Sequence, residues 1–400
     1  MFKKWKSFDF TLAITPLILT AFGIVMIYSA SMVVAVVEHG VPSNFFMMQQ
    51  SKWFGISTIA FIIVCFIPYQ LYQRLMKLIV VIMVALLILV LFIGDSVGNA
   101  RSWIEVGPFQ FQPSEIVKLG LIIYLASIYS KKQKYITDFT KAVLPPLVLT
   151  GIILALIARQ PDIGTAAIIF LIACNVIISS GIKLTHLSLL IVSAVGLGFT
   201  LILKMVTAER ISRFTGAYQP FLDPEDGGYQ LIQSYVAIGT GGFTGEGLGQ
   251  GVQKLGYLTQ PHTDFIMAVI AEELGFIGVI IVIGLLATIV LRGLFISWKC
   301  RDSFGSLLAI GISSMIGIQS FINLGVVSGI LPITGIPLPF VSYGGSSLLV
   351  MMVSMGILNN IARSVKMQEF NQVDEVDTTE EQPAFKYYSV NNKAGKTRSN

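Results

Sequence analysis

Long uncharged apolar stretches follow one another along almost the whole chain, and they constrain its fold more than any other feature. Hydrophobic residues make up 54% of the 400 residues and charged residues only 12%, whereas a soluble globular protein carries about 25% charged residues. One helix needs roughly 17–25 mostly apolar residues to cross a bilayer. The sequence therefore predicts an all-α integral membrane protein.

About ten stretches have the length and composition of a membrane-spanning helix. The expected helices cover residues 10–35, 53–69, 78–94, 114–130, 142–158, 163–182, 184–203, 265–290, 304–330 and 342–362. The first is much longer than the core of a signal peptide, so we expect it to remain as a span. The Pro- and Gly-rich segment Leu331–Gly345 predicts a break between the last two helices.

The positions of Lys and Arg orient these helices, because they gather in alternate connections that the positive-inside rule assigns to the cytoplasm. These residues are Lys3, Lys4 and Lys6; Arg74 and Lys77; Lys131, Lys132, Lys134 and Lys141; Lys183; and Arg292, Lys299 and Arg301. Both termini are then cytoplasmic. The long segment Lys204–Thr263, between helices 7 and 8, and the connection Asp95–Pro113 lie outside, so we expect functional residues on the extracytoplasmic face.

Residues 1–366 form one membrane domain in this interpretation, and residues 367–400 form a cytoplasmic tail. The tail is polar and lacks a periodic apolar pattern, which predicts disorder. The net charge of +5 is small for this length and the basic residues are scattered, so no nucleic-acid partner is expected. The three cysteines offer neither a disulfide framework nor metal-ligand spacing.

Several titratable residues crowd into the stretch Leu255–Gly278 of this otherwise apolar chain. They are His262, Asp264, Glu272 and Glu273. Pro261 interrupts what precedes and a helix is predicted from Phe265, so Asp264 falls at a helix start. A carboxylate there is favoured by the helix dipole, stays in contact with water and could accept a proton from a substrate. A plainer interpretation is equally open, in which Thr263 and Asp264 only cap the helix.

A second charged pair, Glu115 and Lys118, lies one helical turn apart at the start of the span 114–130. Only about twelve uncharged residues follow up to Ser130, so both charges must lie within or just at the bilayer for this helix to cross. Charges inside a membrane are costly and indicate a functional site. The alternative is a structural pair whose two charges neutralise each other.

The expected extracytoplasmic segments contain two further candidates. The Gly-rich stretch Gly239–Gly251 could present backbone N–H groups to an anion, although no Walker-type lysine follows it and such stretches are more often simply flexible. The Pro-rich break, continued by Ser342–Ser347, predicts irregular backbone at membrane depth, which is tolerated only where it is buried in protein or lines a cavity. The cationic candidates around that cavity, solvated in the plainer interpretation, are Arg101, Arg210 and Arg213.

Five segments together resemble the SEDS family, the shape, elongation, division and sporulation proteins. They are Gln112–Lys118, Gln160–Gly164, Pro261–Ile266, Ala271–Gly275 and Leu338–Ser346, in the order that the family shows. The resemblance covers nearly the whole chain from Asp9 to Arg363. It is greater to members that act in cell division or sporulation than to those that act in elongation.

The resemblance implies a ten-helix peptidoglycan glycosyltransferase of the bacterial cell membrane that polymerises lipid II. Its expected partners are a class B penicillin-binding protein, which is the transpeptidase, and other membrane proteins of the division machinery. It also implies that the aspartate of the His-Thr-Asp motif, here Asp264, is essential.

In such a reaction the attacking hydroxyl needs a base and the departing polyprenyl diphosphate needs positive charge. Asp264 is the candidate base. Lys118 is the preferred cation, with Glu115 to position it, and His262 and Ser342 are candidates for substrate binding. A divalent cation could assist.

Two other functions fit part of this pattern. A transporter that moves lipid II across the bilayer would also have a cavity with buried ions and a broken helix. However, the expected topology puts Asp264 at the outer surface rather than at the midplane, where transporter sites lie. A non-catalytic scaffold would leave Glu115, Lys118 and Asp264 without a role, so the sequence favours the enzyme.

Overall fold

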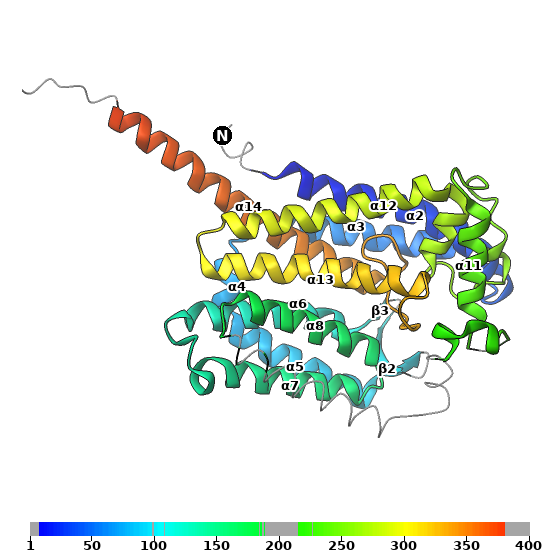
Figure 1. Cartoon of the computed structure of the whole chain (residues 1–400), viewed down its shortest axis with the longest axis horizontal. Coiled ribbons are helices and arrows are strands. Elements are labelled where there is room, and N and C mark those ends of the chain that lie inside the picture. The colour runs from blue at the N-terminus through cyan, green and yellow to red at the C-terminus, as the bar shows by residue number, and fades with distance from the viewer. Residues whose placement is uncertain are drawn as a thin grey trace, which may run out of the picture.

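The computed structural model describes residues 8–97, 100–107, 109–183, 185, 188, 215–225 and 227–380. Its helices are α2 (Phe10–Val37), α3 (Phe45–Phe66), α4 (Gln70–Arg74), α5 (Met76–Ile93), α6 (Pro113–Lys131), α7 (Leu144–Ala158), α8 (Ile163–Ser179), α11 (Tyr229–Gly241), α12 (Ile266–Lys299), α13 (Ser303–Val327) and α14 (Gly345–Glu380). Short helical turns are η1 (Gln133–Tyr135), η2 (Phe139–Val143), η3 (Pro220–Leu222) and η4 (Gln253–Leu255), and the strands are β1 (Asp95–Val97), β2 (Ala100–Val106) and β3 (Phe109–Phe111). The long helices lie side by side in one bundle (Figure 1).

The helices occupy the places that hydropathy predicts. Every predicted span except 184–203 coincides with a helix, and 184–203 lies outside the described residues apart from 185 and 188. Within the described part of the chain, six helical stretches are long and apolar enough to cross a membrane. The protein is therefore a helical multi-pass membrane protein, while the count of ten spans stays a prediction.

Two helices extend beyond their predicted bounds. α3 begins at Phe45 rather than near residue 53, because polar residues such as Gln50 lower the local hydropathy without ending the helix. α14 continues to Glu380 and projects away from the bundle (Figure 1). Residues 367–380 are thus helical rather than disordered, since no Gly or Pro follows Lys366 in this stretch to end the helix. The disorder predicted for 381–400 concerns residues outside the described part.

The expected connection Asp95–Pro113 contains a small antiparallel sheet, in the order β1-β2-β3. Ile104 of β2 lies opposite Phe111 of β3. The β-branched and aromatic residues of this stretch favour strands, and Gly107, with φ of +62°, lies in the turn between β2 and β3. The all-α prediction therefore holds for the membrane bundle but not for this connection.

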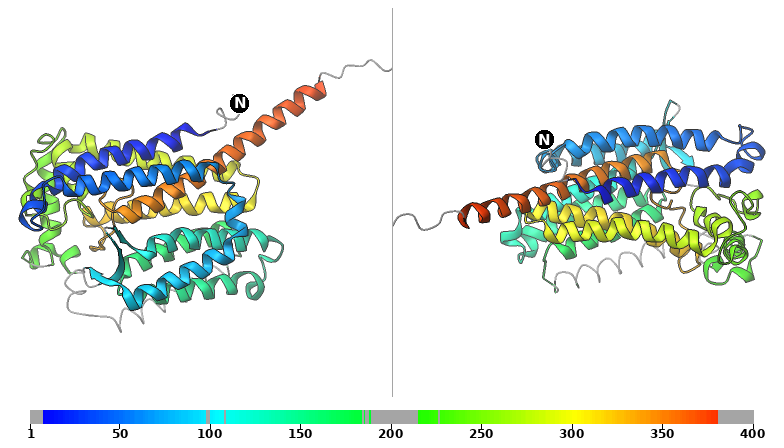
Figure 2. Two further views of the ribbon diagram at one scale, coloured as in Figure 1. Left: turned by 180° about the vertical axis from the view of Figure 1, so that it is seen from behind. Right: turned by 90° about the horizontal axis from the view of Figure 1, so that it is seen from above.

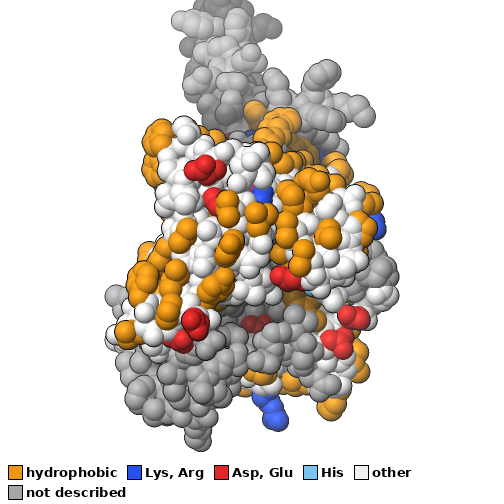
Figure 3. All heavy atoms as spheres, turned by 90° about the vertical axis from the view of Figure 1, so that its right-hand side faces the viewer, with side chains coloured by type: hydrophobic (Ala, Val, Ile, Leu, Met, Phe, Trp, Pro, Cys, Tyr) orange, Lys and Arg blue, Asp and Glu red, His pale blue; other side chains and the backbone are white. Residues whose placement is uncertain are grey.

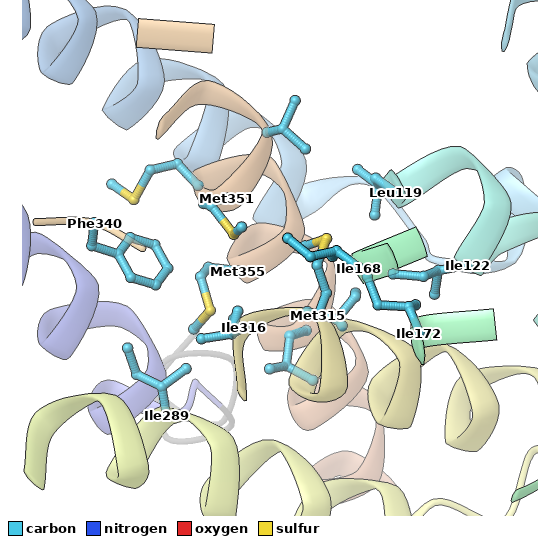
Figure 4. Packing of buried hydrophobic residues seen from close by; sticks show 14 of the residues in the cluster. Leu119, Ile122, Ile168, Ile172, Ile289, Met315, Ile316, Phe340, Met351 and Met355 are labelled. Atoms are coloured by element: carbon cyan, nitrogen blue, oxygen red, sulfur yellow. The ribbon is translucent and has the colours of Figure 1, made fainter. Parts of the chain in front are cut away.

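α13 and α14 form the interior of the bundle. In the most apolar part of each helix, 72% of the residues of α13 and 78% of those of α14 are buried, whereas only 17% of those of α5 are buried. α5 is therefore a peripheral helix that faces lipid. α13 packs against α12, α6 and α8, and α14 packs along α3 (Figure 2). The buried side chains where these helices meet are mainly aliphatic (Figure 4): Leu119, Ile122, Ile168, Ile172, Ile289, Met315, Ile316, Met351 and Met355.

The two ends of the bundle differ. The start of α2 and the extension of α14 lie at one end, and α11, the strands β2 and β3 and the connection between α13 and α14 lie at the other (Figure 1). We call the second end the loop end. Figure 3 looks onto it and shows hydrophobic side chains scattered over the face, with acidic side chains at several places between them.

At the opposite end, Asp9 joins three helices. The residue is 1% exposed, and Oδ1 accepts from the Leu12 N–H to cap α2. Oδ2 accepts from Arg292 of α12, at 3.0 Å from Nε and 2.8 Å from Nη2. Asn359 of α14 donates to the Asp9 carbonyl at 3.0 Å. This cluster therefore fixes the start of α2 against the two longest helices.

We expect Asp9→Ala to lower the free energy of unfolding by about 2 kcal/mol, because it removes a helix cap and the carboxylate partner of Arg292. Asp9→Asn keeps a capping oxygen and should cost less. Thermal melting of the purified protein in detergent compares the three proteins. Equal melting temperatures for the parent and Asp9→Ala would show that the cluster adds no stability.

Candidate functional site

Residues 328–344 connect α13 to α14 without a helix, as the three prolines of this stretch predict. We call them the broken segment. The Ser342 N–H donates to the Leu338 carbonyl at 3.1 Å and closes a tight turn. Inside that turn Phe340 has φ of +66°, a left-handed conformation that is strained for a residue with a side chain. α2 approaches so closely that a Cβ on Gly23 would lie 2.6 Å from a carbonyl oxygen of the segment.

Three predicted site residues, His262, Asp264 and Ser342, meet at this turn. The Ser342 hydroxyl donates to the carbonyl of Thr263 at 2.5 Å and accepts from the N–H of Leu338 at 2.8 Å. The N–H of Tyr343 donates to the carbonyl of His262 at 2.9 Å. The residues directly before α12 are therefore attached to the broken segment through their backbone.

Asp264 lies just before α12 at the loop end. The N-cap position falls on Phe265, so capping alone does not account for a carboxylate at 264. Oδ1 of Asp264 accepts from the Thr263 hydroxyl at 2.7 Å, and the Asp264 carbonyl accepts from Nδ2 of Asn323 at 2.8 Å. The residue is only 8% exposed. The expectation of a freely wetted carboxylate is therefore wrong, because α13 and the broken segment pack over this turn.

Glu115 and Lys118 form the ion pair that the sequence predicts. Lys118 Nζ lies 2.9 Å from Glu115 Oε1, and the two side chains are 2% and 5% exposed. Nζ also donates to Oε1 of Gln319 at 2.8 Å. The second carboxylate oxygen of Glu115 has no partner among the described residues. Because the pair is enclosed, a substrate phosphate can contact Lys118 only if the surrounding helices open.

Side-chain amides connect both the Glu115–Lys118 pair and Asp264 to the broken segment. On α13, Gln319 Nε2 donates to the Pro337 carbonyl at 3.0 Å, and Asn323 Nδ2 donates to the carbonyl of Ile336 at 2.7 Å. On α3, Gln50 Oε1 accepts from the N–H of residue 344 at 3.2 Å. The sequence could have indicated these residues, because each is an amide inside an otherwise apolar helix. Polar side chains at such positions commonly form hydrogen bonds to neighbouring segments.

The described part of the structure does not show the other cationic candidates beside Lys118 or Asp264. Arg101 lies in β2, where its backbone pairs with Ser96 of β1, and its side chain is not among those described. Arg210 and Arg213 fall outside the described part of the chain. Their contact with a substrate stays a prediction.

The Gly-rich stretch Gly239–Gly251 is held by the two acidic residues of α12. The Glu273 carboxylate accepts from the N–H of Gly249 at 3.0 Å. The backbone carbonyls of Glu272 and Glu273 accept from the N–H groups of Glu246 and Gly247, each at 3.0 Å. These three backbone donors are therefore occupied within the protein. The prediction that the backbone N–H groups of this stretch bind a phosphate is therefore wrong for these positions. The stretch is a loop held against α12 rather than a flexible one.

Lys254 forms a second buried ion pair, which sequence spacing does not predict. Its Nζ bonds to Glu273 Oε1 and donates to the Ser29 hydroxyl at 2.8 Å, and the hydroxyl donates to Glu273 at 2.7 Å. The Lys254 and Glu273 side chains are 1% and 0% exposed. This triad joins the long segment before α12 to α2 and α12.

His262 lies in an aromatic cluster. Its ring centroid is 4.5 Å from that of Phe46 and 5.7 Å from that of Tyr343. Burial, with a smaller contribution from His39, lowers the pKa of His262 to about 4, so the imidazole is neutral near pH 7. Its Nδ1 is buried without a partner among the described residues, which suits a hydrogen bond to a ligand rather than an ionic contact.

Two further observations concern ligands. Within the described residues, no group of three or more His, Cys, Asp or Glu side chains is arranged to hold a metal ion, so the predicted divalent cation stays a prediction. A cavity of about 550 Å³ lies between η3, α11 and the residue after α13's C-cap, lined by Tyr218, Phe221, Leu222 and Tyr235 among others. Among the described residues, none of the predicted site residues lines it.

The fold and the site together define a multi-pass helical membrane protein with a buried carboxylate and a buried lysine connected at one end of its bundle. A protein-family model described as "Cell cycle protein" (FTSW_RODA_SPOVE) matches residues 10–367. The chain belongs to this family, as the five sequence segments predict.

Individual relatives match over nearly their full length. The probable peptidoglycan glycosyltransferase FtsW of Bacillus subtilis is 49% identical over 92% of this chain and 93% of its own. Stage V sporulation protein E of the same organism is 41% identical over 91% and 99%. The higher identity to FtsW agrees with the resemblance to division members.

Solved structures match as well. One is a chain from a peptidoglycan synthase complex, studied for its coordination of polymerization and crosslinking, with a TM-score of 0.73, 27% identity and coverage of 90% of this chain and 98% of that one. Another is the rod shape determining protein RodA of Thermus thermophilus, with a TM-score of 0.67, 28% identity and coverage of 90% and 98%.

The triad around Lys254 allows a double-mutant test. We expect Lys254→Met alone to destabilise the protein by about 3–5 kcal/mol, because it leaves the Glu273 charge buried without its cation. Lys254→Met combined with Glu273→Gln should cost less than Lys254→Met alone. Melting temperatures in detergent measure the coupling, and strictly additive losses would contradict a direct ion pair.

Acidification should destabilise the protein through His262. Because its pKa is lowered from 6.5 to about 4 in the folded state, between these values the unfolded chain binds a proton that the folded chain excludes. The stabilising contribution of the neutral ring is complete above about pH 6.5 and is lost as the pH falls toward 4. We expect the melting temperature of His262→Gln to fall less than that of the parent over this range. Parallel curves would contradict the assignment.

Proposed function

We propose that the protein is a peptidoglycan glycosyltransferase that polymerises lipid II into glycan strands during cell division or septum synthesis and releases polyprenyl diphosphate. Two observations outside the site support this proposal. One is the 49% identity, over nearly the whole chain, to a relative named as a probable peptidoglycan glycosyltransferase. The other is the match to a chain of a peptidoglycan synthase complex.

The single structural observation that carries the proposal is the attachment of Asp264 to α13. The residue lies at the loop end, next to His262, and is bonded through its backbone to α13. The same helix contacts the buried Lys118. A group that can accept a proton and a group that can supply positive charge are thus connected through one helix, as an acid–base glycosyl transfer requires.

In the proposed reaction the acceptor sugar hydroxyl attacks the anomeric carbon of the donor. The new C–O bond forms as the bond to the diphosphate oxygen breaks, and the configuration inverts. Asp264 takes the hydroxyl proton, a contribution of roughly 10²–10⁴-fold in rate. Lys118, oriented by Glu115, stabilises the negative charge on the leaving diphosphate once the site opens to admit it. Neutral His262, whose Nδ1 has no partner among the described residues, is the proposed substrate-binding group. The hydroxyl of Ser342 is bonded to the backbone of Thr263 and Leu338, so it would bind substrate only after leaving those partners.

In a membrane we propose that both termini lie in the cytoplasm and that the loop end is extracytoplasmic, on the basis of the positive-inside pattern. The proposed partner is a class B penicillin-binding protein, which would crosslink the strands that this protein polymerises. The match to a chain from a complex in which polymerization and crosslinking are coordinated supports that partner. Further membrane proteins of the division machinery are expected in the same assembly.

A lipid II transporter is the second candidate, because buried ions beside a broken helix are also typical of carriers. Transporter sites lie near the bilayer midplane, and the position of Asp264 at the loop end favours the enzyme. Purified full-length protein, alone and with its transpeptidase partner, should therefore convert lipid II to glycan polymer in detergent. No compartments exist there, so a pure transporter would yield no product.

Asp264→Asn separates chemistry from structure in the same assay. Asparagine keeps the size and the hydrogen-bond acceptor but cannot take the proton. We expect a normal melting temperature, normal lipid II binding and polymerisation reduced by at least about a hundredfold. A folded, lipid II-binding variant that makes long strands at more than about a tenth of the parental rate would remove Asp264 as the base.

A further inference from the structure

Two neighbouring amides of α13 hold the site together. Gln319 and Asn323 lie one helical turn apart and are 0% and 1% exposed. Such buried amides are costly unless their donors and acceptors are bonded. Both nitrogen atoms donate to backbone carbonyls and Gln319 Oε1 accepts from Lys118, whereas Asn323 Oδ1 is buried without a partner among the described residues.

Gln319 connects the cation to the broken segment. Its Oε1 accepts from Lys118 Nζ at 2.8 Å, and its Nε2 donates to the Pro337 carbonyl at 3.0 Å. One side chain thus connects a charge on α6 to the backbone of the broken segment, just before the turn that Ser342 closes on Leu338.

Asn323 connects the proposed base to the same segment. Its Nδ2 donates to the Ile336 carbonyl at 2.7 Å and to the Asp264 carbonyl at 2.8 Å. The carbonyls of Ile336 and Pro337 are consecutive, so the two amides form hydrogen bonds to adjacent peptide units. Lys118 is therefore connected to the backbone of Asp264 by the hydrogen bonds of two amides that meet at neighbouring carbonyls of the broken segment.

We propose that Gln319 and Asn323 are positioning residues, which keep the cation Lys118 and the base Asp264 in the relative placement that glycosyl transfer needs. This inference rests on the proposed function. Neither amide contacts the reacting atoms, and each acts through the residue it holds. Displacing a reacting group by about 1 Å can cost on the order of 10²-fold in rate.

The variants Asn323→Leu and Gln319→Met test the inference, because they keep side-chain volume and remove the hydrogen bonds. We expect kcat for lipid II polymerisation to fall at least about tenfold, with KM changed by less than about threefold, since binding surfaces are retained. Gln319→Glu keeps the acceptor for Lys118 but loses the donor to Pro337, so its kcat should lie between that of Gln319→Met and the parent.

Ser313→Ala is the matched control. Ser313 is a buried polar residue of the same helix, and among the described residues its hydroxyl bonds within α13, to the Ala309 carbonyl at 2.8 Å. Its kcat and KM should equal those of the parent. Parental kcat in folded Asn323→Leu and Gln319→Met would overturn the inference, and so would a rise in KM at unchanged kcat.

Hydrogen exchange compares the parent with the two variants and needs no activity. If the amides hold the broken segment, the backbone N–H groups of residues 338, 342 and 343 should exchange faster in Asn323→Leu and Gln319→Met than in the parent, while those of α13 stay protected. Equal exchange at these three positions in the parent and both variants would overturn the inference. If the parent forms no polymer from lipid II, the proposed function fails, and the exchange result still decides whether the amides hold the broken segment.

Discussion

The structure depends on how the backbone of the broken segment is satisfied. A buried N–H or C=O group without a partner costs several kcal/mol, so buried irregular backbone persists only where the protein supplies partners. Here the partners include neutral side chains from other helices: Gln50 from α3, and Gln319 and Asn323 from α13. α3 and α13 thus carry buried amides that bond to the segment between α13 and α14, which is not a helix.

Buried charges are used differently from these amides. The Glu115–Lys118 and Lys254–Glu273 pairs are almost fully enclosed, and the desolvation of such pairs offsets much of their attraction. The Lys254–Glu273 pair joins the segment before α12 to α12 itself, whereas the Glu115–Lys118 pair lies within α6 and reaches α13 through the bond from Lys118 to Gln319. The Lys254 pair fixes the long segment before α12, and together with Glu272 it occupies backbone donors that could otherwise have bound an anion. The Gly-rich stretch is therefore part of the scaffold.

The sequence predicts well whatever depends on local pattern. Apolar length finds the described spans, and one-turn spacing finds the pair of Glu115 and Lys118. It does not predict the Lys254–Glu273 pair or the contact of Asn323 with Asp264, because both are made between segments that only the folded bundle brings together. It also overstates the exposure of Asp264, since no local pattern reveals that the broken segment folds back over that turn.

The use of neutral amides has a consequence for the proposed chemistry. A base that gains a proton and a cation that meets a diphosphate change their electrostatic surroundings in every reaction cycle. An anchor made of charges would weaken when those charges change, whereas an amide that donates to a backbone carbonyl is indifferent to protonation. Asn323 holds Asp264 by its carbonyl oxygen, so the placement of the residue does not depend on the charge of its side chain. Lys118 differs, because Glu115 and Gln319 bind its ammonium group directly and its position depends on that charge.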